Sequence, residues 1–150
     1  MTVYDWVKLI HVLLATIAVG FNASYGIWLS RAAREPEHEL HVLRGIRTLD
    51  RFANPAYALL LVTGLWMVII SPITLTTFWI AAALVLYALV LILGLGVYTP
   101  TLRRQIRVLE TEGAQSDQYQ WLSRRGTIVG IVLAVLVIVI VGLMVLKPAL

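Results

Sequence analysis

A long charge-free stretch is the feature that most constrains how this chain can fold. From Phe52 to Leu102 the sequence contains no Asp, Glu, Lys or Arg, a run of 51 residues. At about 1.5 Å per residue, one unbroken helix of that length would far exceed a hydrocarbon core of roughly 30 Å. Ser-Pro-Ile-Thr at 71–74 interrupts the run with a proline and small polar residues, which favour a turn. The stretch therefore predicts two membrane-spanning helices joined by a tight turn.

Two further uncharged runs, Leu9 to Ser30 and Gly126 to Leu146, are each long enough for one more span. The chain is 60% hydrophobic and only 13% charged, with a mean hydropathy of +0.87, whereas the surface of a soluble domain needs more polar residues. We therefore expect a single all-α membrane domain, folded as a transmembrane four-helix bundle. The expected spans lie at about residues 4–29, 54–70, 77–98 and 126–146.

The segments between the spans carry their own signals. Arg-Glu-Pro-Glu at 34–37 predicts a turn, and apolar residues spaced by three from Leu40 to Leu49 predict a short amphipathic helix in the membrane interface. Asn54 and Pro55 fit the N-cap and the first helical residue of the second span. Further along, Thr99-Pro100 predicts a kink or the end of the third span, and residues 112–117 predict a turn.

The positive charge is concentrated between the spans. All ten arginines lie in residues 31–51 and 103–125, which is the distribution that the positive-inside rule produces for cytoplasmic segments. The high isoelectric point of 9.8 therefore indicates membrane topology and not a nucleic-acid partner. The expected location is the bacterial inner membrane, with both termini outside. The basic flank follows the first apolar run, so that run is interpreted as an uncleaved anchor and not as a signal peptide.

Small residues recur every four positions at the start of the fourth span. Gly126, Gly130 and Ala134 form a seam that lets another helix approach closely. That helix could belong to the same chain, to a second copy of the chain in a homodimer, or to another membrane subunit. The chain contains no cysteine, which excludes disulfides, thiolate metal sites and iron–sulfur clusters.

Few polar side chains fall within the spans, and His11 is foremost among them. Asn22 and Tyr25 follow on the same face of the first span, and we expect that face to line the bundle interior, because an unsatisfied polar group in hydrocarbon is costly. Tyr87 lies near the middle of the third span, where its hydroxyl needs an interhelical partner. The full stripe on the first span consists of Lys8, His11, Ala15, Ala18, Asn22 and Tyr25.

His11 has two interpretations. It is either a functional group, as an axial haem ligand, a copper ligand or a proton carrier, or a neutral imidazole hydrogen-bonded to a neighbouring helix. Met67 and Met144 fall near the same end of their spans, where a thioether could share a haem iron or a copper ion with the imidazole, although methionine is also a common packing residue. The sequence offers no nucleophile–base pair, phosphate-binding loop or carboxylate pair, so no particular enzymatic reaction is predicted.

Two short motifs are similar to those of a known family. Trp-Val-Lys-Leu-Ile-His at 6–11 resembles the start of the first helix of HemJ-type protoporphyrinogen oxidases, which carries a Lys-x-x-His motif. Asn-Pro-Ala at 54–56 and Thr-Gly-Leu-Trp at 63–66 resemble that family's second helix. The whole chain resembles more closely a bacterial family of four-span integral membrane proteins of unknown function, distantly allied to HemJ-type and copper-resistance CopD-type membrane domains. The resemblance implies that His11 is a haem ligand.

One departure limits what this resemblance implies. Residues 79–84, Trp-Ile-Ala-Ala-Ala-Leu, lack the lysine that HemJ-type proteins carry in their third helix, so protoporphyrinogen oxidation is not carried over. The leading hypothesis is a membrane protein that binds haem b or a porphyrin in a redox role, with His11 as ligand and Lys8 near a propionate or the lipid headgroups. The competing hypothesis is a cofactor-free structural subunit or small transporter component that self-associates through the Gly126, Gly130 and Ala134 seam.

Overall fold

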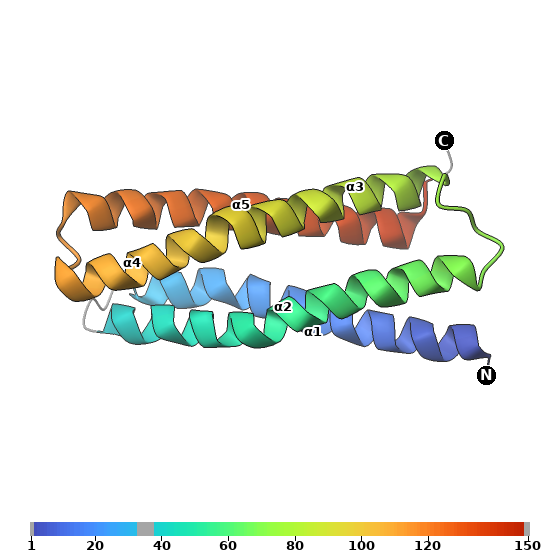
Figure 1. Cartoon of the computed structure of the whole chain (residues 1–150), viewed down its shortest axis with the longest axis horizontal. Coiled ribbons are helices and arrows are strands. Elements are labelled where there is room, and N and C mark those ends of the chain that lie inside the picture. The colour runs from blue at the N-terminus through green and yellow to red at the C-terminus, as the bar shows by residue number, and fades with distance from the viewer. Residues whose placement is uncertain (1, 33–37, 149–150) are drawn as a thin grey trace.

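The computed structural model describes residues 2–32 and 38–148, and this part of the chain is helical with no β-strand. Its elements are α1 (Val3–Ala32), α2 (Glu39–Ile69), α3 (Phe78–Leu93), the π-helical segment η2 (Gly94–Tyr98), α4 (Thr99–Thr111) and α5 (Asp117–Leu146) (Figure 1). Helix α3, η2 and α4 follow one another without a break, so four helical rods are long and apolar enough to cross a membrane. The predicted all-α fold with four such helices is confirmed. The turn expected at 34–37 lies outside the described residues.

The bundle consists of two helical hairpins. Helix α1 pairs with α2, while α5 pairs with the continuous rod of α3, η2 and α4 (Figure 1). Both termini and the loop between α2 and α3 lie at one end of the bundle, called here the terminal end. The turn between α4 and α5 and the start of α2 lie at the other end, called here the arginine-rich end because residues 38–51 and 103–125, which contain most of the arginines, are in that part of the bundle.

Helix α2 differs from the sequence prediction. Residues 40–49 are helical, but they continue directly into the second span, so the separate interfacial helix was wrong. Asn54 and Pro55 lie inside α2 and do not begin a helix. The physical reason is burial: Leu43 and Ile46 are 0% and 2% exposed, so this segment packs lengthwise in the bundle. That packing offsets the one backbone hydrogen bond that a proline removes from a helix interior.

The break predicted at Thr99-Pro100 takes the form of a π-helical segment. Pro100 lies in the first turn of α4, immediately after η2, and the helix continues through it without interruption. The N–H of Thr99 donates to the carbonyl of Gly94, five residues back, which is the hydrogen-bond pattern of a π-helix. Helix α5 begins at Asp117, well before Gly126, after the predicted turn. There the Ser116 hydroxyl caps the helix by accepting the N–H of Tyr119 at 3.2 Å.

The best-packed part of the molecule lies at the arginine-rich end. Its buried cluster draws on both hairpins and consists of Tyr25, Leu43, Ile46, Leu102, Ile106, Val108, Tyr119 and Leu122. Helix α2 alone has 31 residues, or about 46 Å at 1.5 Å per residue, against a hydrocarbon thickness of roughly 30 Å. Because arginine side chains do not remain in hydrocarbon, we expect the arginine-rich end to be the part that extends beyond it.

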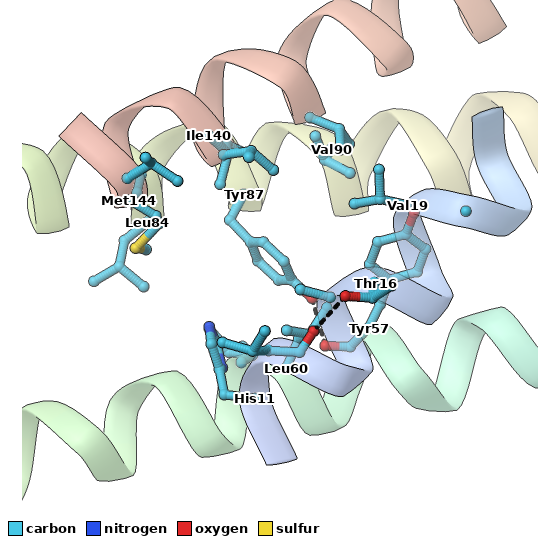
Figure 2. Close-up of a pocket in the computed structure, with 18 residues that line it drawn as sticks. His11, Thr16, Val19, Tyr57, Leu60, Leu84, Tyr87, Val90, Ile140 and Met144 are labelled. Atoms are coloured by element: carbon cyan, nitrogen blue, oxygen red, sulfur yellow. Dashed lines mark hydrogen bonds between the residues drawn. The ribbon is translucent and has the colours of Figure 1, made fainter. Parts of the chain in front are cut away.

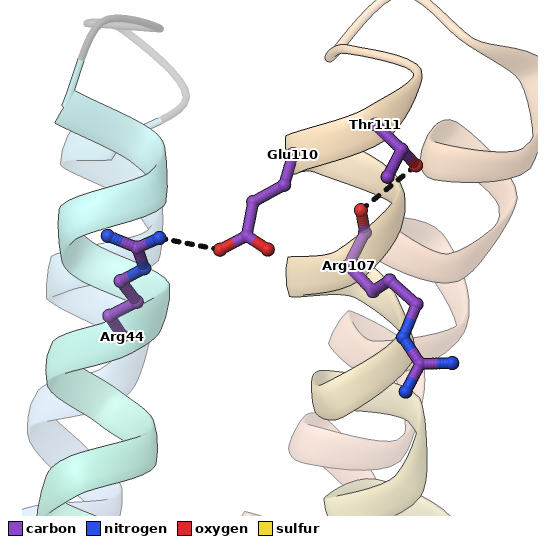
Figure 3. Close-up of polar contacts among 4 residues, drawn as sticks. All are labelled: Arg44, Arg107, Glu110 and Thr111. Atoms are coloured by element: carbon purple, nitrogen blue, oxygen red, sulfur yellow. Dashed lines mark hydrogen bonds and ion pairs between the residues drawn. The ribbon is translucent and has the colours of Figure 1, made fainter.

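An ion pair also joins the hairpins at this end. Arg44 of α2 contacts Glu110 of α4 at 2.6 Å (Figure 3). The two side chains are 57% and 38% exposed, so the pair contributes at most about 1 kcal/mol. Arg107 points away from this pair, and its carbonyl accepts the Thr111 hydroxyl at 3.1 Å (Figure 3). The buried cluster, and not the ion pair, therefore holds the two hairpins together.

Candidate functional site

An apolar cavity of about 560 Å³ lies between the two hairpins, and α1, α2, α3 and α5 all contribute to its wall (Figure 2). Most of its lining side chains are aliphatic. The lining residues with polar side chains are His11, Thr16, Tyr57 and Tyr87, and the one sulfur-containing residue is Met144. The volume falls within the ~300–1,000 Å³ of cavities that bind drug-sized ligands and cofactors.

His11 is held at the cavity wall by a threonine of the neighbouring helix. Its Nδ1 lies 2.9 Å from Oγ1 of Thr63 on α2. The Thr63 hydroxyl has a single proton, which it donates to the carbonyl of Leu59 at 2.8 Å, with the carbonyl of Leu60 at 3.1 Å. Thr63 therefore accepts from His11, and the imidazole carries its proton on Nδ1. The lone pair on Nε2 is then left for a ligand, and Figure 2 shows the ring pointing into the cavity.

A glycine lets the imidazole approach α2 closely. A methyl group added at Gly64 would lie 3.2 Å from Cε1 and 3.7 Å from Nδ1 of His11. This spacing is tighter than an ordinary van der Waals contact, so any larger side chain at this position would push the ring away from Thr63. Sequence reasoning did not include Thr63 or Gly64 among the site residues. The available signal was the Thr-Gly-Leu-Trp motif at 63–66, which resembles the second helix of HemJ-type proteins but was given no role at the site.

The other polar residues of α1 contact α2 further toward the arginine-rich end. Asn22 donates through Nδ2 to the carbonyl of Ala18 at 3.1 Å and to the hydroxyl of Tyr57. The hydroxyl of Tyr25, which is buried, donates to Oδ1 of Asp50 at 2.9 Å. Together with His11 and Thr63, these contacts form a polar seam along the α1–α2 hairpin.

Tyr87 connects the two hairpins across the cavity. It lines the cavity from α3, and its hydroxyl donates to the backbone carbonyl of Tyr57 on α2 (Figure 2). Met144 of α5 also lines the cavity, whereas Met67 is not among the lining residues. Lys8 is exposed on α1, one helical turn before His11, and lies outside the lining. Of the four proposed cofactor-binding residues, the fold thus brings His11 and Met144 to one cavity.

The small-residue seam on α5 faces the rest of the same chain at two of its three positions. A methyl group added at Gly126 would lie 3.5 Å from Oε1 of Gln105 on α4, and one added at Gly130 would lie 3.8 Å from the ring of Tyr98. Ala134 is exposed. Gly126 and Gly130 therefore let α5 pack against α4 and η2.

Among residues 2–32 and 38–148, no three His, Asp or Glu side chains lie close enough together to bind a metal ion. Of the side chains that line the cavity, His11 and Met144 offer a nitrogen and a sulfur donor. A single imidazole is sufficient as the protein's contribution to a haem iron.

Four apolar helical rods and a largely apolar interior cavity define a multi-pass integral membrane protein. The chain belongs to the DUF2269 family of predicted integral membrane proteins, which matches residues 5–148. The expectation of a family of integral membrane proteins is thereby confirmed. No curated protein and no solved structure matches the chain significantly.

Proposed function

We propose that this protein binds haem b, or a closely related porphyrin, in the cavity between its hairpins, with His11 as the axial ligand. The observation that carries this proposal is the imidazole at the wall of a 560 Å³ apolar cavity, with Nδ1 engaged by Thr63 at 2.9 Å. A hydrogen bond of this kind on the second ring nitrogen is common in metal-binding histidines, where it fixes the tautomer and orients the ring.

The other lining residues suit a flat, lipophilic ligand. Aliphatic side chains from four helices would pack against the macrocycle and exclude water, and Met144 could provide a second axial ligand. Lys8 lies one turn before His11 and would reach a propionate or the lipid headgroups. Bound haem would supply one-electron redox chemistry, and the apolar surroundings would tune its potential.

The proposal places the protein in the bacterial inner membrane with its arginine-rich end in the cytoplasm and its termini outside. The distribution of arginines supports this orientation. In this orientation, His11 and the cavity lie in the outer half of the membrane.

Titration of the purified protein with haemin, followed by its Soret absorption, tests the proposal. We expect the wild-type protein and His41→Ala to give the same band, because His41 is exposed on α2 and away from the cavity. The His11→Ala variant should lose the band or show that of a differently ligated iron. A wild-type protein that binds no haem, or an unchanged band in His11→Ala, would overturn the proposal.

Metal analysis of the same samples separates haem from copper. If the wild-type protein contains copper, and both His11→Ala and Met144→Leu lose it, the cavity is a copper site and not a haem site. A colourless, metal-free wild-type protein would favour the cofactor-free alternative. That alternative also predicts an oligomer in native mass measurements that dissociates when Ala134, the exposed position of the small-residue seam, becomes Leu.

A further inference from the structure

The wall of the cavity is not equally covered on all sides. On α2 and α3, every lining residue is buried or half-buried; Leu60, Ala83 and Val90, for example, are 9%, 1% and 7% exposed. The exposed lining residues are all on the other two helices. They are Val12, Thr16 and Gly20 on α1, and Val141 and Val145 on α5.

Backbone contacts are sparse on both sides of the cavity: α1 and α5 approach each other closely at few residues, and α2 and α3 do not approach each other closely. On the α2–α3 side, side chains cover the cavity instead: the Tyr87 hydroxyl reaches from α3 and donates to the carbonyl of Tyr57. On the α1–α5 side, no hydrogen bond between lining side chains of the two helices is found in the described residues, and the lining residues along the edge are exposed. A methyl group added at Gly20 would meet no atom within 4 Å, so the α1 edge of the cavity is uncovered there.

The uncovered edge lies within the charge-free segments of both helices. Residues 12–20 fall in the uncharged run 9–30, and residues 141–145 fall in the uncharged run 126–146. The one hydroxyl on this edge, that of Thr16, donates to the carbonyl of Val12 at 2.9 Å and is therefore satisfied without water. Every group along the edge can thus face hydrocarbon without leaving a polar atom unpaired.

We infer that the cavity opens sideways into the membrane between α1 and α5, and that its ligand is loaded from the lipid phase. The identity of the ligand as haem rests on the proposed function, but the lateral opening itself rests only on the exposure of its edge. A lipophilic molecule dissolved in the bilayer can pass this edge without crossing water. The molecule must also be small enough to pass between α1 and α5.

A bulky side chain on the edge tests the route of loading. Haem is supplied from liposomes to protein in separate vesicles, and the Soret band is followed with time. We expect Gly20→Phe to slow loading about tenfold, equivalent to about 1.4 kcal/mol on the barrier. Gly26→Phe is the matched control, since Gly26 is also exposed on α1 with no atom within 4 Å of an added methyl group, but lies outside the cavity.

A second readout does not depend on haem. The natural chain has no cysteine, so Ala83→Cys places one thiol on the covered side of the cavity. We expect lipid-soluble N-ethylmaleimide to modify it, a charged water-soluble thiol reagent not to modify it, and Gly20→Phe but not Gly26→Phe to slow the modification. Equal rates in all three backgrounds, or no reaction with the maleimide, would overturn the lateral opening. If the protein shows these modification rates but binds no haem, the lateral opening is supported and only the proposed function is overturned.

Discussion

At the scale of single residues, the chemistry of the cavity depends on which ring nitrogen of His11 carries the proton. Thr63 decides this, because its own hydroxyl proton is already donated to a carbonyl of α2 and it can only accept from the imidazole. Gly64 makes the contact possible by leaving room for the ring. The two adjacent residues of α2 therefore act as positioning residues for the imidazole, and neither lines the cavity itself.

The Thr63→Val variant tests this arrangement with almost no change in side-chain size. We expect haemin affinity to fall about 10–100-fold, as it typically does when the hydrogen-bond partner of a metal-binding histidine is removed. The ¹⁵N chemical shifts of the imidazole should show the Nδ1–H tautomer in the wild-type protein and a mixture in the variant. Thr127→Val is the control, because that hydroxyl donates to its own helix, at the carbonyl of Ser123, away from the cavity. Finding the Nε2–H tautomer in the wild-type protein would contradict the assignment.

At the scale of helices, the position of α5 depends on small residues that face α4 and η2. Gly126 lies against Thr101 and Gln105, of which Gln105 also donates to the hydroxyl of Tyr119 at 3.4 Å. These side chains are buried, so they have little room to move away from a larger neighbour. A methyl group at Gly126 would meet these side chains at ordinary van der Waals distance, and a larger side chain would have to displace them.

The Gly126→Leu variant should consequently be less stable than the wild-type protein. We expect a loss of about 1–3 kcal/mol in the free energy of unfolding, which is typical of overpacking a helix interface. The Gly142→Leu variant is the control on the same helix, since a methyl group added at Gly142 meets no atom within 4 Å. Reversible unfolding in mixed detergent micelles measures both. Equal stability of the two variants would show that α5 does not pack on α4 through Gly126.

At the scale of the whole molecule, the two ends of the bundle differ in packing as well as in charge. The arginine-rich end contains the buried cluster shared by both hairpins, whereas the terminal end contains the cavity. The helices are longer than the hydrocarbon core requires, so we expect the well-packed cluster to reach into the region of headgroups and water. The orientation of the bundle thus decides which compartment that cluster faces.

Single cysteines in the natural cysteine-free chain test the orientation. Leu75→Cys places a thiol in the loop at the terminal end, where Leu75 is 49% exposed, and Gln115→Cys places one in the exposed turn between α4 and α5. We expect a membrane-impermeant maleimide to label the first in intact cells and the second only after permeabilisation, since arginine-rich segments remain in the cytoplasm. The reverse labelling pattern would show that the arginine-rich end is outside.

The sequence predicted the features that depend on composition and spacing, and missed those that depend on how the hairpins meet. Uncharged runs indicated four helices because hydrocarbon excludes charge, whichever neighbours surround them. Pro55 was misinterpreted because a local rule for helix starts cannot detect that Leu43 and Ile46 are buried lengthwise in the bundle. The cavity could not be predicted at all, because its volume is set by the separation of two hairpins that are far apart in the sequence.

The uneven packing of the two hairpins has a mechanical consequence. They are fastened together at one end by a continuous buried cluster and are joined only sparsely beside the cavity. The arginine-rich end can therefore act as a hinge between the two hairpins. A small change of the angle between the hairpins at this hinge becomes a larger change in their separation at the terminal end. The cavity can thus widen or narrow while the buried cluster that stabilises the bundle stays intact.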